Sequence, residues 1–348
     1  MQEGVRGRDR LPRESRELRK EGSTGARRAP DIGGEPWFPS YGASREASDK
    51  SSRPHHNGPT ERWLIFVGRR LMSEDWLAGV GGVRLFIRRW TATQPIAAVL
   101  IVHGVGEHSG RYEPLAQALT RAGVAVFAYD LRGHGRSEGQ RGHIDRFSDY
   151  LDDLDRAVAW TRGHRPCPLF LIGHSLGGLV VLHGTARTPA LADGLILSSP
   201  ACGLAVPVPG WQRALATLAS AAWPALAMNR ARVDSSYLSH DPAIGPAYVH
   251  DPLVHFRITA RCYTEVVTRM RGAAAAAASV RWPALVFQAG DDHLVDANAT
   301  RAMFERLASA DKQLVRLEGW YHEVFNEVER ARVIEQTLAW LHAHAAAH

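Results

Sequence analysis

The sequence predicts an α/β fold, with a mostly parallel central sheet flanked by helices and interrupted by a helical insertion. From residue 82 onward, short β-branched runs alternate with amphipathic helical patterns, an arrangement typical of a parallel sheet covered by helices. Several runs are apolar on both faces, as the interior strands of such a sheet must be. Between two of these runs lie roughly 80 residues, far more than one crossover between parallel strands needs.

The composition, with 45% hydrophobic and 22% charged residues, is ordinary for a soluble globular protein. The length of 348 residues predicts more than one core, or one core with a large insertion. Residues 1–70 differ, because Arg, Glu, Ser, Gly and Pro dominate them without periodicity. We expect a disordered basic N-terminal extension there. The predicted core occupies 72–200 and 271–348, and a helical lid occupies 201–270. Met72 is a candidate start site, since the periodic sequence begins directly after it.

The net charge of +6 arises almost entirely in the extension, where residues 1–70 hold 15 Lys and Arg against 10 Asp and Glu. The near-neutral remainder argues against nucleic acid as a partner. Three widely spaced cysteines, Cys167, Cys202 and Cys262, predict neither a disulfide framework nor a metal site. The apolar runs are too short to span a bilayer and no signal-like segment is visible, so we expect a cytoplasmic protein.

The expected strands are short β-branched runs that end near Gly, Ser or Asp. They cover residues 83–90, 97–104, 124–133, 168–175, 194–200, 284–292 and 312–319. The expected helices carry apolar residues at three- and four-residue spacing, which places these residues on one face. They cover residues 113–122, 147–162, 176–188, 301–308 and 324–345, and the alanine run 273–278 predicts one more. An apolar patch that begins at Trp63 fits a strand or a docking segment.

The insertion contains the stretch GWQRALATLASAAWPALAMN, which begins at Gly210. It is apolar around most of a helix, and such a helix must bury both sides or cover an apolar cavity. Because it follows a strand of the sheet, we expect it over the carboxyl ends of the strands, as a lid. A plain packing helix is the alternative.

The pentapeptide Gly173-His174-Ser175-Leu176-Gly177 has the pattern G-x-S-x-G, in which glycines allow a sharp turn beside the serine. Chance alone yields on the order of 0.2 such matches in a chain of this composition. The position of the match in the chain therefore decides whether it indicates a nucleophile. It follows the apolar run PLFLI and opens the helical run LGGLVVLHGTA, which exposes a nucleophilic hydroxyl above a sheet. A capping serine in a tight turn is the alternative.

A nucleophilic serine needs a base within hydrogen-bond reach and a carboxylate that fixes the tautomer of that base. His322 follows the last expected strand in the loop GWYHE, and Asp292 ends the run ALVFQAGDD. Both positions lie where strands deliver residues to the carboxyl edge of the sheet, in the order Ser, Asp, His. Asp291 and Asp296 compete with Asp292, and a surface-loop histidine is the alternative for His322.

Backbone amides are expected to form an oxyanion hole beside Ser175. The helix that begins after this serine presents N–H groups and a partial positive charge. A second donor is expected from the turn HGVG at residues 103–106, with Val105 as the donor. A glycine-rich turn without function is the alternative.

Several segments together resemble the monoacylglycerol lipase and lysophospholipase group of α/β-hydrolases, which is serine aminopeptidase S33-like. They are HGVGEHSGRYEPLAQAL, YDLRGHGRSEGQRGHIDRFSDYLDDL, GHSLGG, AGDDHLVD and LEGWYHEVFNE. The resemblance begins at about residue 82, and within the alanine-rich insertion only DPLVH matches. It implies an α/β-hydrolase fold with a catalytic triad and two oxyanion amides, namely Ser175, Asp292 and His322 with Val105 and Leu176.

By the same resemblance, Glu107 and Arg111 lie near the alcohol side of the substrate, where they steer a glycerol headgroup or, alternatively, only brace the loop. The implied activity is hydrolysis of single-chain lipid esters, as a monoacylglycerol lipase or lysophospholipase, through an acyl-enzyme and without cofactor or metal. A peptidase or amidase and a non-catalytic lipid-binding module are the alternatives. The expected partners are a small lipid ester and, transiently, a membrane surface that the lid contacts. The oligomeric state is not predicted.

Overall fold

The computed structural model describes residues 72–229 and 234–346. The expected extension over 1–70 and the apolar patch at Trp63 lie outside these ranges. Within them, every helix is too short or too polar to cross a membrane.

A mixed sheet of eight strands forms the centre of the described residues, in the order β1-β2-β4-β3-β5-β6-β9-β10. All pairs from β4 to β10 are parallel, whereas β1 and β2 are antiparallel to their neighbours. The predicted mostly parallel sheet is therefore confirmed. Its strands are β1 (Met72–Ala78), β2 (Arg84–Trp90), β3 (Ala97–Val102), β4 (Val124–Tyr129), β5 (Leu169–His174), β6 (Gly194–Ser198), β9 (Ala284–Ala289) and β10 (Lys312–Leu317).

Strand β1 was not expected from the sequence. Glu74 and Asp75 interrupt its apolar pattern, but an edge strand exposes such side chains to water. Glu74 there pairs with Arg88 of β2 at 2.8 Å, and the Trp76 ring meets the Phe86 ring edge-on at 5.4 Å. These cross-strand contacts stabilise a strand that its own residue pattern does not predict.

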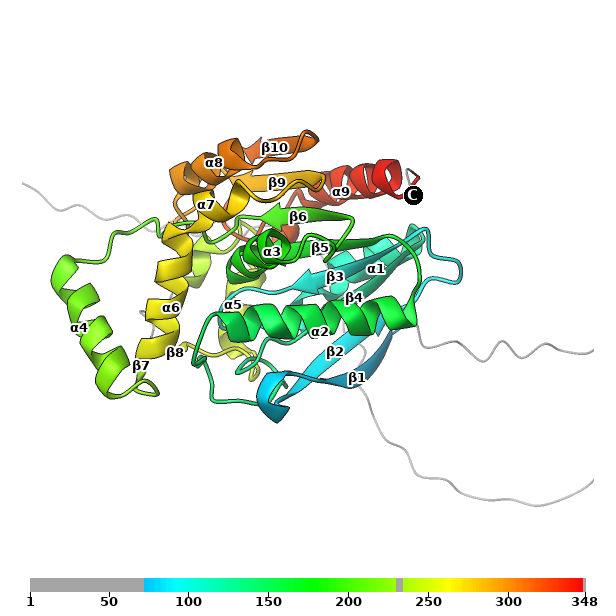
Figure 1. Cartoon of the computed structure of the whole chain (residues 1–348). Coiled ribbons are helices and arrows are strands. Elements are labelled where there is room, and N and C mark those ends of the chain that lie inside the picture. The colour runs from blue at the N-terminus through cyan, green and yellow to red at the C-terminus, as the bar shows by residue number, and fades with distance from the viewer. Residues whose placement is uncertain (1–71, 230–233, 347–348) are drawn as a thin grey trace, which may run out of the picture. The chain divides into compact units, whose positions relative to one another are not determined.

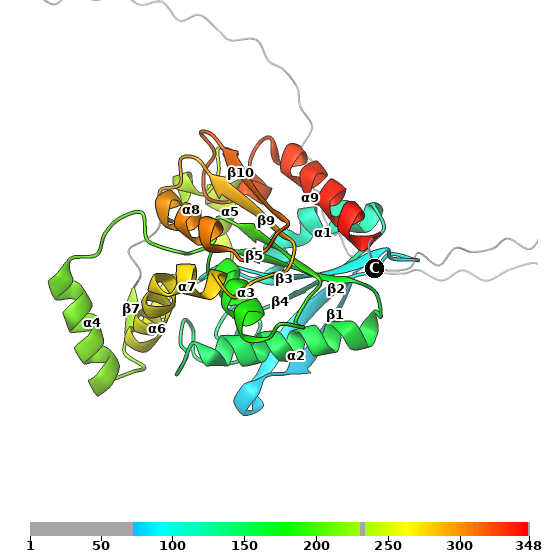
Figure 2. The same cartoon turned by 45° about the horizontal axis from the view of Figure 1, so that its top comes forward.

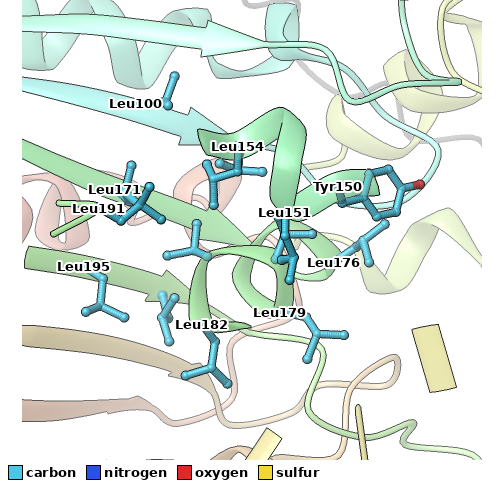
Figure 3. Packing of buried hydrophobic residues seen from close by; sticks show 14 of the residues in the cluster. Leu100, Tyr150, Leu151, Leu154, Leu171, Leu176, Leu179, Leu182, Leu191 and Leu195 are labelled. Carbon is cyan, nitrogen blue, oxygen red and sulfur yellow. The ribbon is translucent and has the colours of Figure 1, made fainter. Parts of the chain in front are cut away.

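Helices cover both faces of the sheet (Figure 1). Residues of α1 (Glu113–Arg121) and α9 (Arg330–Ala345) pack in one core, whereas residues of α2 (Ser148–His164), α3 (Leu176–Arg187) and α8 (Ala297–Arg306) pack in the other. Figure 3 shows leucines of α2 and α3 packed with leucines of the strands, and all of them are buried: Leu100, Leu151, Leu154, Leu171, Leu179, Leu182 and Leu195.

Two expected helix boundaries were wrong. The helix expected from residue 324 begins with a separate 3-10 turn at Val324–Asn326, and α9 starts only at Arg330. Buried Glu327 separates the two, because its carboxylate accepts hydrogen bonds from the Tyr321 amide and the His240 side chain. Helix α8 begins at Ala297, earlier than expected, because the Asp296 carboxylate caps it through the Asn298 amide.

The insertion between β6 and β9 contains α4 (Gly210–Ala222), β7 (Ala227–Asn229), the 3-10 turn Ser235–Tyr237, α5 (Ile244–His250), β8 (Arg257–Thr259), α6 (Ala260–Arg271) and α7 (Ala273–Ala277). Figures 1 and 2 show α4 and α6 side by side, beyond the carboxyl ends of the parallel strands. Only Ala216 and Ser220 of α4 are buried. Of the two possibilities given by the sequence, burial of both sides does not occur, and the role of this helix as a lid stays a prediction.

Candidate active site

Ser175 stands at the sharp turn between β5 and α3. Its backbone has φ 52° and ψ −117°, a conformation that costs a non-glycine residue of order 1–3 kcal/mol. A side chain at Gly173 would come within 2.6 Å of the Gly177 carbonyl oxygen, and one at Gly177 within 2.0 Å of the Val102 carbonyl oxygen. The predicted need for glycine on both sides of the serine is therefore confirmed.

His322 and Asp292 meet at the carboxyl ends of β10 and β9. His322 Nδ1 lies 2.8 Å from Asp292 Oδ2, and both side chains are nearly buried. Asp292 Oδ1 accepts hydrogen bonds from the backbone amides of Leu294 and Val295, each at 2.9 Å. These bonds fix the carboxylate, so that one oxygen is left for the imidazole.

The two competing aspartates point elsewhere. The Asp291 side chain is 56% exposed and its carboxylate lies 3.2 Å from His293 Nε2, while Asp296 caps α8. Of the three aspartates weighed from the sequence, Asp292 is the one that contacts His322.

The charges of this pair shift both pKa values. Burial alone would lower the pKa of His322, but the carboxylate of Asp292 raises it above its ordinary value, with smaller contributions from Glu323 and Glu107. Burial would raise the pKa of Asp292, yet the attraction to His322 and the two backbone bonds lower it. The pair therefore favours a charged carboxylate beside an imidazole of increased basicity.

Ser175 and His322 line the same pocket. Among the described residues no hydrogen bond joins Ser175 Oγ to the imidazole; such bonds are often long in unliganded enzymes and shorten in the substrate complex. The ring of His174, which precedes the serine, lies 4.7 Å from that of His322.

The turn at residues 103–106, hereafter the oxyanion turn, lies directly against Ser175. A side chain at Gly104 would come within 3.2 Å of Ser175 Cβ, and Val105 lines the pocket beside it. Leu176 is the first residue of α3, so its amide has no acceptor within that helix. The His255 amide of the insertion donates to the Gly106 carbonyl at 2.9 Å, which holds the turn from the other side.

Glu107 and Arg111 belong to a buried ion cluster with Glu323, hereafter the ion cluster. Arg111 donates to both oxygens of Glu323 at 2.6 and 2.7 Å and to Glu107 at 2.8 Å. Glu107 also accepts from the Gly104 amide and from the Tyr112 hydroxyl. Arg111 thus connects the oxyanion turn to the residue that follows His322.

This arrangement determines the charges of the ion cluster. Burial would raise the pKa of Glu107, but Arg111, with smaller help from His174, His103 and the Gly104 amide, lowers it to about 2. Burial would lower the pKa of Arg111, but Glu323 and Glu107 raise it well above its ordinary value. Two carboxylates therefore share one guanidinium at ordinary pH. The sequence did not single out Glu323; its place directly after His322 is the one signal that could have.

The pocket has a volume of about 490 Å³, and two chemically different groups of residues line it. The polar group, hereafter the catalytic end, consists of Ser175, His322, His174, Glu107 and Glu323. The second group comes from one face of α6, hereafter the acyl wall, at the helical spacing i, i+3, i+4 and i+7: Tyr263, Val266, Val267 and Met270. These wall residues were not predicted, because their apolar pattern is also that of an ordinary packing helix.

Within residues 72–229 and 234–346, no three His, Cys, Asp or Glu side chains cluster in a way that could hold a metal ion. The three cysteines are free thiols.

A family model described as "Serine aminopeptidase, S33" matches residues 93–329, more than half of the chain. The chain belongs to the S33 family. This S33 protein is 34% identical to "Monoacylglycerol lipase" of Mycolicibacterium smegmatis, over 78% of this chain and 98% of the relative. It is 38% identical to "Phospholipase YtpA" of Bacillus subtilis, over 72% and 97%.

A crystal structure of the monoacylglycerol lipase of Paleococcus ferrophilus matches with a TM-score of 0.69 and 32% identity, over 75% of this S33 chain and 99% of that one. The fold is therefore that of an α/β-hydrolase, as the sequence predicts, and the protein is an ester hydrolase.

Proposed function

We propose that this protein is a monoacylglycerol lipase. The observation that carries the proposal is that Ser175 and His322 line the same pocket as the acyl wall on α6. A pocket with a few polar groups at one end and apolar walls elsewhere suits a molecule with one ester and one alkyl chain. The relatives named as a monoacylglycerol lipase and a phospholipase support a lipid ester as the substrate class.

In the proposed mechanism, Ser175 Oγ attacks the ester carbonyl while His322 takes its proton. The contact of Asp292 with Nδ1 keeps Nε2 of the imidazole available as the base. The amides of Val105 and Leu176 stabilise the oxyanion, each such donor contributing about 2.7–4 kcal/mol. The alcohol leaves with the proton from His322, and a water molecule activated by the same imidazole then hydrolyses the acyl-enzyme.

The charges at the catalytic end favour a neutral glycerol headgroup over a phosphate-bearing one. None of the described residues that line the pocket is Arg or Lys. The nearby cation of the ion cluster, Arg111, lies between Glu107 and Glu323. An anionic phosphate would meet uncompensated carboxylate charge, so monoacylglycerol is favoured over lysophospholipid.

The peptidase or amidase alternative needs a carboxylate that can hold a substrate ammonium group. Both pocket-lining glutamates, Glu107 and Glu323, are engaged by Arg111. The non-catalytic alternative does not account for a buried carboxylate that contacts a histidine in the serine pocket. An ester hydrolase uses all three groups and needs no free carboxylate for a substrate ammonium group.

The test compares three substrates with the purified protein: monooleoylglycerol, lysophosphatidylglycerol with the same acyl chain, whose headgroup has a net negative charge, and an aminoacyl anilide. We expect monooleoylglycerol to have the highest kcat/KM, by about tenfold or more if headgroup repulsion amounts to 1.4 kcal/mol. A higher kcat/KM for the lysolipid or the anilide would contradict the proposal.

The outer face of α4 supports a second part of the proposal, that the protein docks transiently on lipid surfaces. Trp211, Leu215 and Leu218 of α4, and Trp223 directly after it, are between 59% and 68% exposed. Large apolar side chains gathered on an exposed helix are typical of an interface with protein or membrane. Because Gln212 and Ala216 of the same helix line the pocket, docking would bring a lipid close to it.

A further inference from the structure

His174 is a buried histidine that the proposed mechanism does not use. It ends β5, directly before Ser175, and is 5% exposed. It lines the pocket at the catalytic end, with its ring 4.7 Å from that of His322. Its side chain is therefore next to the histidine that returns a proton to the departing alcohol.

The contacts of His174 with Ser198 favour one tautomer of the ring. Nδ1 lies 3.2 Å from the Ser198 carbonyl oxygen and 3.1 Å from Ser198 Oγ. A carbonyl oxygen can only accept, so Nδ1 carries the proton and Nε2 carries a lone pair. Burial, together with the charge of His322, lowers the pKa of His174 to about 4. The ring is therefore neutral at ordinary pH, and Nε2 is an acceptor.

The two carboxylates at the catalytic end are already engaged. Glu107 and Glu323 are bound by Arg111. Nε2 of His174, by contrast, has no hydrogen-bond partner among residues 72–229 and 234–346. A polar atom of this kind inside a pocket is satisfied by water or by a ligand that donates a hydrogen bond.

We propose that His174 determines alcohol specificity: its Nε2 accepts a hydrogen bond from a free hydroxyl of the leaving alcohol. This inference rests on the proposed function, since glycerol supplies such hydroxyls. The ester of a plain alcohol has no donor for Nε2 and displaces the water that would satisfy it. His174 thereby selects polyol esters over simple alkyl esters of the same acid.

The test compares monooleoylglycerol with propyl oleate, which has the same carbon skeleton without the two hydroxyls. We expect the wild-type protein to have the higher kcat/KM for monooleoylglycerol. His174→Phe keeps an aromatic ring but lacks the acceptor, so the ratio of the two kcat/KM values should fall about three- to tenfold, the value of one neutral hydrogen bond. His174→Gln, whose side-chain carbonyl accepts a hydrogen bond, should recover part of the ratio.

His183→Phe is the matched control, because the His183 Nε2 bonds to the Arg269 carbonyl and lies outside the pocket; it should leave the ratio as in wild type. An unchanged ratio in folded His174→Phe would overturn the inference. Equal kcat/KM values of the wild-type protein for the two esters would overturn it without any variant. Hydrolysis of propyl oleate with no hydrolysis of monooleoylglycerol would instead refute the proposed function itself.

Discussion

The catalytic end of the pocket and helix α4, which also lines the pocket, are held in opposite ways. At the catalytic end, buried groups are bonded in a chain that runs from the oxyanion turn through Glu107, Arg111 and Glu323 to the loop of His322. Helix α4 buries only Ala216 and Ser220 and leaves an apolar face in water. The comparison suggests that the chemistry depends on rigid polar contacts, whereas substrate entry depends on a loosely held apolar helix.

The largest expected effect concerns the rigid end. Asp292→Asn should lower kcat about 10⁴-fold, because an amide at this position favours the wrong tautomer of His322. Asp291→Asn is the matched control; the exposed side chain of this neighbour pairs with His293, and the variant should retain nearly full activity. Steady-state hydrolysis of monooleoylglycerol measures both. Equal losses of kcat in the two variants would contradict the role of Asp292 as the partner of His322.

The sequence could predict that these residues of the rigid end lie close together, for a physical reason. The serine, the aspartate and the histidine each follow a strand of the parallel sheet, and the carboxyl ends of such strands meet at one edge. Glu323 and the acyl wall could not be predicted in the same way, because their roles depend on contacts between segments far apart in the chain. Strand β1 was missed because partner contacts, not its own pattern, stabilise it.

The second effect concerns the ion cluster. Arg111→Met should lower the free energy of unfolding by about 3–5 kcal/mol, since it leaves two buried carboxylates without a counter-charge. Arg301→Met is the control, because its pair with Glu305 is exposed and should contribute only about 0.3–0.5 kcal/mol. Denaturant unfolding measures both. Similar losses of unfolding free energy in the two variants would show that burial does not increase the contribution of the ion cluster to stability.

The third effect probes the loosely held end. Replacing Trp211, Leu215 and Leu218 by serine should lower binding to lipid vesicles about tenfold or more, because burial of one large apolar side chain contributes up to about 1.5–3 kcal/mol. The rate on vesicle-held substrate should fall relative to that on a dissolved ester. Val328→Ser, at an exposed apolar residue outside α4, is the control. Unchanged vesicle binding of the triple variant would exclude α4 as the docking face.

The smallest effect is a displacement of the pH profile. Catalysis needs a neutral His322, so kcat/KM should fall as the pH drops through the pKa of this group, which Asp292 raises above 6.5. Arg111→Met uncovers more negative charge and should move the acidic limb to higher pH. Asp292→Asn removes negative charge. The acidic limb of the kcat/KM profile, measured on the residual activity of this variant, should therefore move to lower pH. Displacements in the same direction would contradict the electrostatic account.

The claim on which the account depends is that Ser175 forms a covalent acyl-enzyme. A fluorophosphonate probe, followed by intact-mass measurement and peptide mapping, tests it directly, with Ser199→Ala as a control at another buried serine of positive φ. The account predicts one adduct, on Ser175, in the wild-type and Ser199→Ala proteins and none in Ser175→Ala. A Ser175→Ala protein that is still labelled and still hydrolyses monooleoylglycerol at the wild-type rate would contradict it.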